Sequence, residues 1–437
     1  MEWYAAGALL VGTVVGLMMI GVPVALAFMT ANLLGTLVFV GSIGGLIQVV
    51  DNSTALIARF QFVPVPMFIL MGSLFFYSGL AIRVFDALDM LFGRLPGRLC
   101  FLTVAGGATF STLTGSSMAN TAMLGSLMVP EMQRRGYSRR MSMGPILGTG
   151  GLAMIIPPSN LGVLLASIAS IDVGKILVAG LIPGIVLALL YSGLILVQVA
   201  YNPSAAPSYD IAPSNWREKT LAVGINILPM GIVVFMVVGF IILGIATPSE
   251  AAAFGVLGAL ALAAAFRLLS WKVIWQSLES TVKVGAMVFL IIMNSNVFSQ
   301  LLAYSGASAG LLQWTTGFEV PVMALLVVIF LVLLLLGMFM DPVSMMLISI
   351  PIFFPLIQSV GVDPIWFGIF MLLALEMSQT TPPFGLLLYI MLGVAPKGTT
   401  LFQVASAAFP FLICDAILVV LLLAFPILAL YLPGMMR

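Results

Sequence analysis

The chain reads Gly148-Thr-Gly-Gly-Leu-Ala-Met-Ile-Ile-Pro-Pro-Ser-Asn160 in its first half and Glu376-Met-Ser-Gln-Thr-Thr-Pro-Pro-Phe-Gly385 in its second. Both Pro-Pro pairs interrupt apolar runs and belong to a larger repeated pattern. Each member of the pattern recurs 225 residues later, Pro130, Gly136, Pro157 and Pro158 as Pro355, Gly361, Pro382 and Pro383. Interrupted apolar segments at matching places in two halves point to the binding site of a secondary transporter. The sequence therefore predicts two copies of one all-α unit, each containing a broken helix.

The composition is that of a polytopic protein folded in lipid. Of 437 residues, 62% are hydrophobic and 7% are charged, against about 25% charged in an average soluble domain. The absence of histidine excludes imidazole acid–base chemistry. Cys100 and Cys414 lie in apolar surroundings and predict neither a disulfide framework nor a metal site. No phosphate-loop pattern is present, and the net charge of +1 gives no reason to expect nucleic acid. We expect no enzyme activity and no cofactor.

Apolar stretches of about 17–25 residues are candidate membrane spans. We expect complete crossings near 4–20, 23–40, 64–80, 140–171, 176–200, 220–243, 249–267, 284–303, 364–394 and 403–432. The first of these lacks a basic leader and a cleavage signal, so we expect it to be retained as a helix. The stretches 140–171 and 364–394 carry the Pro-Pro pairs near their middle and predict broken helices.

Two further pairs of apolar segments, 98–113 with 119–133 and 321–337 with 343–358, are short and joined by polar tips. Each pair predicts a re-entrant hairpin that enters and leaves on one side of the membrane. Non-helical backbone at that depth is tolerated only against protein or a water-filled cavity.

The charges predict the orientation. If the N-terminus lies outside, thirteen of the sixteen Lys and Arg residues fall on the cytoplasmic side, as the positive-inside rule requires. The three outside are Arg59, Lys175 and Arg437. The thirteen on the cytoplasmic side are Arg83, Arg94, Arg98, Arg134, Arg135, Arg139, Arg140, Arg217, Lys219, Arg267, Lys272, Lys283 and Lys397. The base of the first hairpin is basic, whereas the base of the second, around Glu319 and Asp363, contains no Lys or Arg. The hairpins are therefore expected to enter from opposite faces, the second repeat to be inverted, and both termini to be periplasmic.

Three segments are expected at the membrane surface. The polar stretch 202–219 predicts a linker between the halves. Residues 81–96 and 268–283 mix charged and apolar residues at helical spacing, which predicts amphipathic helices along the cytoplasmic interface. Such helices could brace the bundle or connect moving and fixed parts, and the sequence favours neither role.

The first polar tip is Thr114-Gly-Ser-Ser-Met-Ala-Asn120. Gly115 permits a tight turn, and Ser116 or Ser117 can cap the returning helix. Oxygens gathered at such a turn suit a hard cation, and the helix N-terminus beside them suits an anion. A serine N-cap without further function would explain the same pattern.

The second tip is Gly337-Met-Phe-Met-Asp341-Pro-Val-Ser344. Asp341 is a good N-cap, and as an acid within a membrane segment it is also a candidate functional residue. Proline frees the carbonyl four residues earlier, so each broken helix offers oxygens to the tip that precedes it. Together with hydroxyls of Ser159, Thr380 or Thr381, these carbonyls could complete an oxygen cage for Na⁺. A plain proline kink would account for either break alone.

Glu376 and Asp415 are the other acids expected to be buried. Glu376 precedes the second Pro-Pro pair and could orient Thr380 or receive a proton. Asp415 is expected to be a structural hydrogen-bonding residue.

These residues resemble the large membrane subunit of the tripartite ATP-independent periplasmic (TRAP) transporters, the DctM-like family, over essentially the whole chain. In the first half the resemblance is carried by Gly115-Ser-Ser-Met-Ala-Asn120, Pro130-Glu-Met, Gly136-Tyr137, Ile156-Pro-Pro-Ser159 and Pro183-Gly184. In the second half it is carried by Met340-Asp341, Pro351, Pro355, Gly361-Val-Asp-Pro364 and Thr381-Pro-Pro-Phe-Gly385.

The resemblance implies an elevator-type transporter of the bacterial inner membrane, in which a domain with both hairpins slides against a scaffold. It implies import of a small organic anion, such as a carboxylate, driven by Na⁺ and delivered by a periplasmic substrate-binding protein. It also implies a small four-helix membrane subunit, which we expect to be a separate polypeptide. Glu376-Met-Ser departs from the small or apolar residues usual in the family and is similar to the branch associated with oxo-acids, dicarboxylates and aromatic acids.

Carried over by position, the resemblance implies two sodium sites. The first residue set is Ser116, Ser117, Asn120, Gly151 and Pro157. The second residue set is Gly337, Asp341, Thr380, Thr381 and Pro382. The substrate is expected near Ser117, Asn120, Ser159, Ser344 and Thr381.

The implied domains follow the repeats. Scaffold helices and the first amphipathic arm occupy 1–97, and the first hairpin and broken helix occupy 98–175. Scaffold helices, the linker and the second amphipathic arm follow at 176–320. The second hairpin and broken helix occupy 321–400, and a C-terminal helix occupies 401–437.

Two other functions stay open. One is a stand-alone sodium–dicarboxylate symporter of related architecture that needs no binding protein. The other is a membrane subunit of an enzyme complex, which the absence of histidine disfavours because haem or quinone sites commonly use it.

Overall fold

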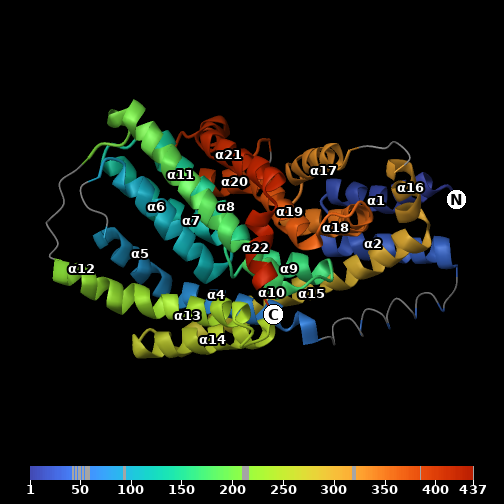
Figure 1. Ribbon diagram of the computed structural model, residues 1–437, viewed down its shortest axis with the longest axis horizontal. Helices are drawn as coiled ribbons and strands as arrows, with labels where there is room; N and C mark the ends of the chain where they lie inside the picture. The colour runs from blue at the N-terminus through green and yellow to red at the C-terminus, as the bar shows by residue number, and fades with distance from the viewer. Residues whose placement is uncertain are drawn as a thin grey trace.

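The computed structural model describes residues 1–41, 44, 47, 51, 54, 60–91, 95–208, 216–316, 321–383 and 385–436. The expectations for Arg59, Arg94, Glu319, Phe384 and Arg437, and for part of the 202–219 linker, lie outside these residues. The described part of the chain is helical and contains no strand (Figure 1).

In chain order, the first half of the protein comprises α1 (Trp3–Met19), α2 (Val24–Gly35), η1 (Thr36–Val40), η2 (Phe60–Phe62), α4 (Pro64–Ser78), α5 (Leu80–Leu91), α6 (Arg98–Thr114), α7 (Ser117–Arg134), α8 (Arg139–Ile155), α9 (Asn160–Ile168), α10 (Val173–Ala179), α11 (Leu181–Tyr201) and η3 (Pro203–Ala205). The second half comprises α12 (Trp216–Ala222), η4 (Val223–Ile227), α13 (Leu228–Ile242), α14 (Pro248–Ala265), α15 (Trp271–Tyr304), α16 (Ala307–Thr316), α17 (Val322–Gly337), α18 (Pro342–Ser359), α19 (Pro364–Gln379), α20 (Leu386–Val394), α21 (Leu401–Ala424) and α22 (Ile427–Met435).

The length and apolarity of the helices fit a multi-pass membrane protein. Among the described residues, six helical segments are long and apolar enough to cross a membrane: Val173–Tyr201, Trp216–Ile242, Pro248–Ala265, Trp271–Tyr304, Pro342–Ser359 and Leu401–Ala424. Two bent pairs would raise that number to eight if each is one span. They are α4 with α5, bent by 65°, and α8 with α9, bent by 42°.

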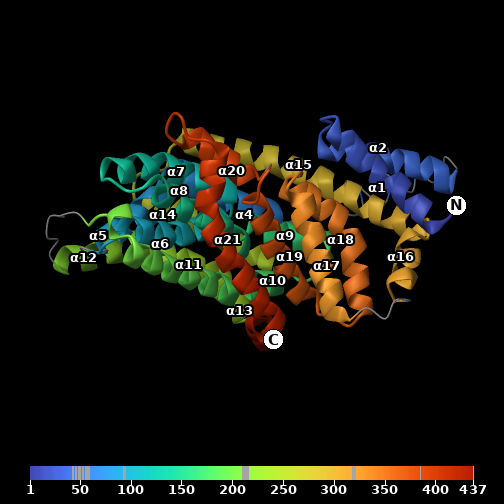
Figure 2. The same ribbon diagram turned by 90° about the horizontal axis from the view of Figure 1, so that it is seen from above.

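Helix pairs and breaks lie at the positions predicted for the hairpins and broken helices, and α18, one arm of the second pair, is by itself long and apolar enough to cross a membrane. The first hairpin is α6 and α7, and the second is α17 and α18; Figures 1 and 2 place them on opposite sides of the middle of the molecule. The first break (residues 156–159) separates α8 from α9, and the second break (residues 380–385) separates α19 from α20. Both breaks contain a cis Pro-Pro bond.

The sequence prediction was wrong about the second amphipathic arm. Residues 268–283 do not form a separate surface helix, because most of them belong to α15, a continuous helix of 34 residues. At 1.5 Å per residue this helix is about 51 Å long. Its range contains no proline, and the single Gly285 costs too little to end a helix. Helix α16, between α15 and the second hairpin, was not predicted.

Side-chain caps begin the helices that follow the tips and the first break. Ser116 accepts a hydrogen bond from the Ala119 amide at the start of α7, and Asp341 accepts from the Val343 and Ser344 amides at the start of α18. Ser159 likewise accepts from the Gly162 amide, 3.0 Å away, and so begins α9. These caps give partners to the first amides of each helix, which the apolar surroundings could not provide.

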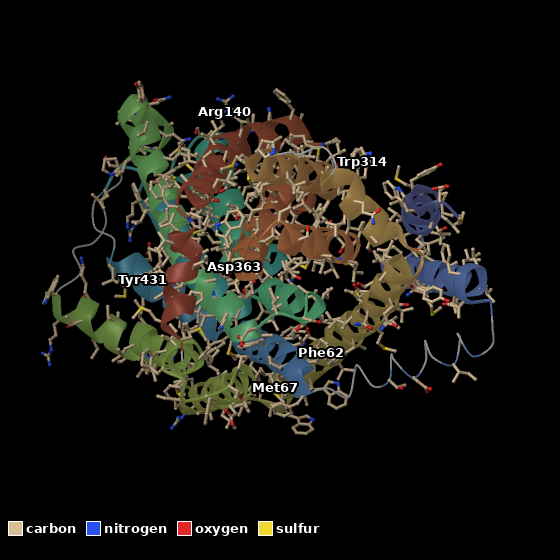
Figure 3. All side chains as sticks on the ribbon, turned by 45° about the vertical axis from the view of Figure 1, so that its right-hand side comes forward. Phe62, Met67, Arg140, Trp314, Asp363 and Tyr431 are labelled. Carbon is tan, nitrogen blue, oxygen red and sulfur yellow. The ribbon has the colours of Figure 1, made fainter. Side chains whose placement is uncertain are left out.

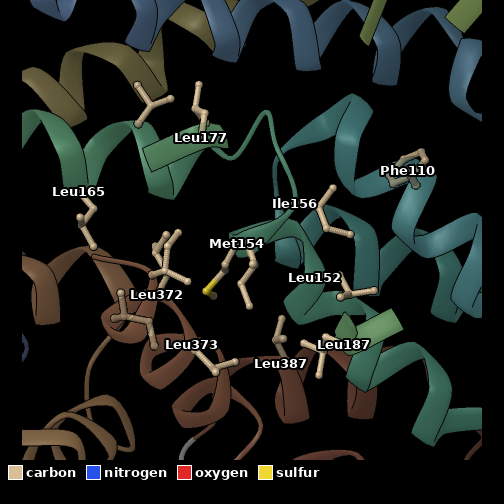
Figure 4. Packing of buried hydrophobic residues seen from close by; sticks show 14 of the residues in the cluster. Phe110, Leu152, Met154, Ile156, Leu165, Leu177, Leu187, Leu372, Leu373 and Leu387 are labelled. Atoms are coloured by element: carbon tan, nitrogen blue, oxygen red, sulfur yellow. The ribbon is translucent and has the colours of Figure 1, made fainter. Parts of the chain in front are cut away.

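Helices α8 and α19 form the centre of the protein. Every residue from Met141 to Ile155 is buried, and so is every residue from Ile365 to Gln379. Figure 4 shows Met154 of α8 beside Leu372 and Leu373 of α19, and Leu152 of α8 belongs to the same apolar cluster. Helices α6, α7, α11 and α21 pack around α8, whereas α14 and α15 both pack against α4 and α13 packs against α14 (Figure 1). Exposed charged residues such as Arg140 lie at the periphery (Figure 3).

We predict that Gly180→Ala destabilises the protein. A Cβ at Gly180 would overlap the carbonyl oxygen of Ile155, the last residue of α8. Overpacking of this kind costs about 1–3 kcal/mol, so thermal unfolding in detergent should begin at a lower temperature. Gly193→Ala in α11 is the matched control, because no atom lies within 4 Å of its added Cβ. Equal unfolding temperatures for the two variants would contradict the tight contact at Gly180.

Candidate functional site

The tip of the first hairpin lies against the first break. Gly115 has φ +60°, and a Cβ there would lie 2.8 Å from the carbonyl oxygen of Pro158. The Asn160 side-chain amide, at the start of α9, donates to the Thr114 carbonyl over 3.3 Å. The pairing of tip and break predicted from the sequence is therefore made by direct contacts.

A cavity of about 220 Å³, the tip cavity, lies beside the first tip and between α4 and α15. Its lining side chains are hydroxyl, amide, aromatic and aliphatic groups without charge: Ile69, Ser73, Phe76, Tyr77, Thr114, Ser116, Ala119, Asn160, Ser280 and Val284, with Gly72 also at the wall. At Gly72 the α4 backbone approaches so closely that a Cβ would lie 2.7 Å from the Thr114 carbonyl oxygen. The tip cavity thus places the N-terminus of α7 beside neutral hydrogen-bonding groups.

Two members of the first residue set have buried oxygen atoms without a partner. The Asn120 amide nitrogen donates to Ser111 Oγ over 2.9 Å and to the Thr149 carbonyl over 3.0 Å. The Asn120 Oδ1 atom and the Ser117 hydroxyl, however, have no hydrogen-bond partner within the described chain. Buried polar atoms without a partner are rare and need an explanation, such as an ion.

The other members of that set differ in their surroundings. Ser116 caps α7 and lines the tip cavity. Pro157 is buried in the first break. Gly151 lies against Glu376, whose carboxyl occupies the space where a Cβ of residue 151 would stand.

The second residue set has its side-chain oxygens partnered. Asp341 accepts from two amides and from the Ser344 hydroxyl at the start of α18. The hydroxyls of Thr380 and Thr381 both donate to the Met377 carbonyl, over 3.1 Å and 2.6 Å. Pro382 is exposed. Gly337 touches Ser378, one residue before the end of α19, so the second tip also lies against its own broken helix.

The residues expected near the substrate are mostly buried. Ser117, Asn120, Ser159 and Ser344 are each at most 4% exposed, and Thr381 is half-buried. Ser159 is engaged in bonds to Met154 and Gly162. The tip cavity is lined instead by Asn160, and by Ser73 and Tyr77 of α4, which sequence reasoning did not select. Asn160 directly follows Ser159 after the first Pro-Pro pair, which was an available signal.

The two broken helices meet at equivalent positions. Gly151 and Glu376 are 225 residues apart and touch. Met154 and Gln379 have the same separation, and the Gln379 amide donates to the Met154 sulfur over 3.6 Å. Contact between equivalent residues is what a two-fold relation between repeats produces.

Glu376 also belongs to a buried cluster that joins three helices. The Tyr191 hydroxyl of α11 lies 3.2 Å from Glu376 Oε1 and 2.5 Å from Asp415 Oδ1 of α21. All three side chains are at most 2% exposed. Asp415 thus takes part in a structural hydrogen bond, as expected. Thr380 is held by Met377, so the alternative in which Glu376 orients Thr380 is not seen in the described residues.

Known proteins resemble the chain over nearly its whole length. The sequence profile of the tripartite ATP-independent periplasmic transporter, DctM component, matches residues 11–428. The ectoine TRAP transporter large permease protein of Halomonas elongata is 28% identical, over 97% of this chain and 98% of its own length. The C4-dicarboxylate TRAP transporter large permease protein of Rhodobacter capsulatus is 29% identical, over 97% and 98%. The solved structure of the Alcanivorax borkumensis YdaH transporter has a similar fold, with a TM-score of 0.68 at 13% identity, over 92% and 98%.

We predict that Gly337→Ala disrupts the second tip and that Ser378→Gly partly restores it. A Cβ at Gly337 would overlap the Ser378 side chain, and removing that side chain frees the space. The single change should lower the thermal unfolding temperature, and the double variant should recover part of the loss because contacting residues are not additive. Additive effects of the two substitutions would show that this contact is not the cause.

Proposed function

The chain belongs to the DctM component family of tripartite ATP-independent periplasmic transporters, and we propose that it imports a small organic anion in symport with Na⁺. Its relatives are transporter permeases and not enzymes. The observation that carries the sodium proposal is the pair of unpartnered buried oxygens on Ser117 and Asn120. Both residues lie in the first turn of α7, directly after the tip that contacts the first break, and unwound backbone at such breaks coordinates the coupling ion in secondary transporters.

The first residue set offers suitable ligands for Na⁺. Hard cations prefer oxygen atoms of hydroxyl, amide and backbone carbonyl groups. Ser117 and Asn120 supply the first two kinds, and the first break supplies the Ala153 carbonyl freed by Pro157, whereas the Met154 carbonyl freed by Pro158 accepts a hydrogen bond from Ser159. For the second residue set, Na⁺ would have to share oxygens that already accept or donate hydrogen bonds. We therefore expect the second site to bind more weakly.

The tip cavity is our candidate for the substrate site. It joins the N-terminus of α7, which favours negative charge, to the neutral donors of Ser116 and Asn160. These groups suit a carboxylate. One relative is named for C4-dicarboxylate, which supports a small organic anion as the substrate class.

Alternating access is proposed to follow the elevator mechanism. The hairpins and broken helices would move as one body against α4, α13, α14 and α15, which are joined by the contacts of α4 with α14 and α15 and of α13 with α14. The tip cavity lies at the border of these groups, so such motion would carry it across the membrane. Hairpins entering from opposite faces would close the two sides in turn.

We place the protein in the bacterial inner membrane with both termini in the periplasm. A periplasmic binding protein is proposed to deliver the substrate, and a separate small membrane subunit to complete the transporter. Family membership supports both partners.

Uptake into proteoliposomes tests the proposal. The chain is reconstituted with the small subunit, and labelled dicarboxylate is supplied with or without the binding protein. We expect uptake only with an inward Na⁺ gradient and only with the binding protein. Equal uptake without the gradient would refute sodium coupling. Full uptake of free substrate would favour the stand-alone symporter.

We predict that Ser117→Ala weakens sodium dependence. Loss of one ligand, at about 1.4 kcal/mol, should raise the Na⁺ concentration for half-maximal uptake about tenfold. Ser126→Ala is the matched control, because Ser126 lies exposed on the same helix. Unchanged sodium dependence in Ser117→Ala would remove this residue from the site.

Thr381→Ala should likewise raise the Na⁺ requirement if the second site binds at the second break. Thr399→Ala, outside both residue sets, serves as the control. Wild-type sodium dependence in Thr381→Ala would exclude its hydroxyl as a ligand.

A further inference from the structure

The two broken helices can pack together because a glycine on one faces a large side chain on the other. Gly151 of α8 and Glu376 of α19 occupy equivalent positions and face each other. A side chain at both positions would not fit, since the Glu376 carboxyl already fills the space beside the Gly151 Cα atom. The missing side chain at Gly151 therefore lets α19 place a long side chain against α8.

The Glu376 side chain is held at its far end as well. Its Oε1 atom lies 3.2 Å from the Tyr191 hydroxyl, which also contacts Asp415. Thus α11 and α21 fix the carboxyl while α8 packs against it. The residue is 2% exposed, and interior packing this dense transmits displacements.

The same contact lies between the two proposed sodium sites. Gly151 is a member of the first residue set, and Glu376 stands one helical turn before Thr380 of the second. One turn further along, Met154 touches Gln379 across the same interface. A displacement of either break on ion binding would have to move this interface.

We propose that Glu376 is a positioning residue that couples the two sodium sites, so that filling one raises the affinity of the other. The inference rests on the proposed sodium symport and adds a pathway between its sites. It assigns a role to Glu376, a residue that belongs to neither residue set. By linkage the coupling is reciprocal, and coupled sites commonly change each other's affinity by about five- to 150-fold.

Sodium binding to the purified full-length chain tests the coupling without requiring transport. The thermal unfolding temperature is measured over a range of Na⁺ concentrations, with K⁺ keeping the ionic strength constant. Ligands that bind only the folded state raise this temperature according to their affinity. In the wild type we expect the unfolding temperature to rise with Na⁺ concentration more steeply than it would for two independent sodium sites.

Glu376→Ala removes the side chain that fills the interface. We expect the unfolding temperature to rise with Na⁺ concentration only as steeply as for independent sites. The affinity of one site should then be the same whether the other site is filled or empty, so that the ratio of the two affinities is about one. Thr381→Ala completes a double-mutant cycle with Glu376→Ala. In the wild-type background Thr381→Ala should weaken sodium binding at the first site, and in the Glu376→Ala background it should leave the sodium affinity of the first site unchanged. Glu376→Gln keeps the volume and an oxygen for Tyr191, so it should retain the steep dependence.

Gly144→Ala is the control for a merely structural effect. Its added Cβ would press α8 against Ala407 and Phe411 of α21, away from the contact with α19. This variant should lose stability but keep the wild-type steepness. If Glu376→Ala does not fold, Tyr191→Phe replaces it, because this change keeps the ring and removes the hydroxyl that holds Glu376.

Equal steepness in the wild type and in Glu376→Ala, or in its replacement, would overturn the coupling. Loss of steepness in Gly144→Ala would also overturn it, since any packing defect would then have the same effect. A wild type that Na⁺ stabilises no more than K⁺ would instead overturn the sodium proposal itself. The two failures are therefore distinguishable.

Discussion

A helix that breaks inside a membrane leaves backbone donors and acceptors that lipid cannot satisfy, and this constraint governs the centre of the protein. At the first break, Ser159 caps α9 and donates to the Met154 carbonyl over 2.6 Å. Asn160 then joins α9 to the Thr114 carbonyl of the hairpin tip. The hairpin reaches the break because Gly115 lets backbone lie against backbone. Each tip and its break thus form one polar unit within an apolar body.

The two repeats use this unit differently. Around the first tip, buried oxygens of Ser117 and Asn120 stay without partners, whereas Asp341 and Ser344 satisfy each other at the second. The central interface is also unequal, with glycine on one helix and glutamate on the other. Two-fold related positions that touch cannot both carry large side chains, so close packing itself requires the repeats to diverge there. Glu376 therefore reaches Tyr191 and Asp415, and Gly151 has no counterpart to that contact.

Much of the architecture was predictable because its signals are local. Apolar runs give the helices, proline interrupts them, and glycine or a capping residue marks each tip. The start of α7 was predicted to within one residue, with Ser116 or Ser117 as the cap, and the start of α18 was predicted from Asp341; the structure shows Ser116 and Asp341 capping the two helices. The second amphipathic arm was mispredicted because the local signal was missing. No proline or capping residue separates 268–283 from the next crossing, and a change in polarity was mistaken for the end of a helix.

The sequence by itself determined the helical class, the repeated hairpins and the breaks, because these depend on residues close together in the chain. Only the tertiary structure decided which oxygens of the two residue sets remain unpartnered, that Asn160 with Ser73 and Tyr77 lines the tip cavity, and that Gly151 faces Glu376. These features join segments far apart in sequence, up to 225 residues for the central contact. Such contacts are fixed by how helices pack, and composition and spacing along one helix carry no record of the neighbour it will meet.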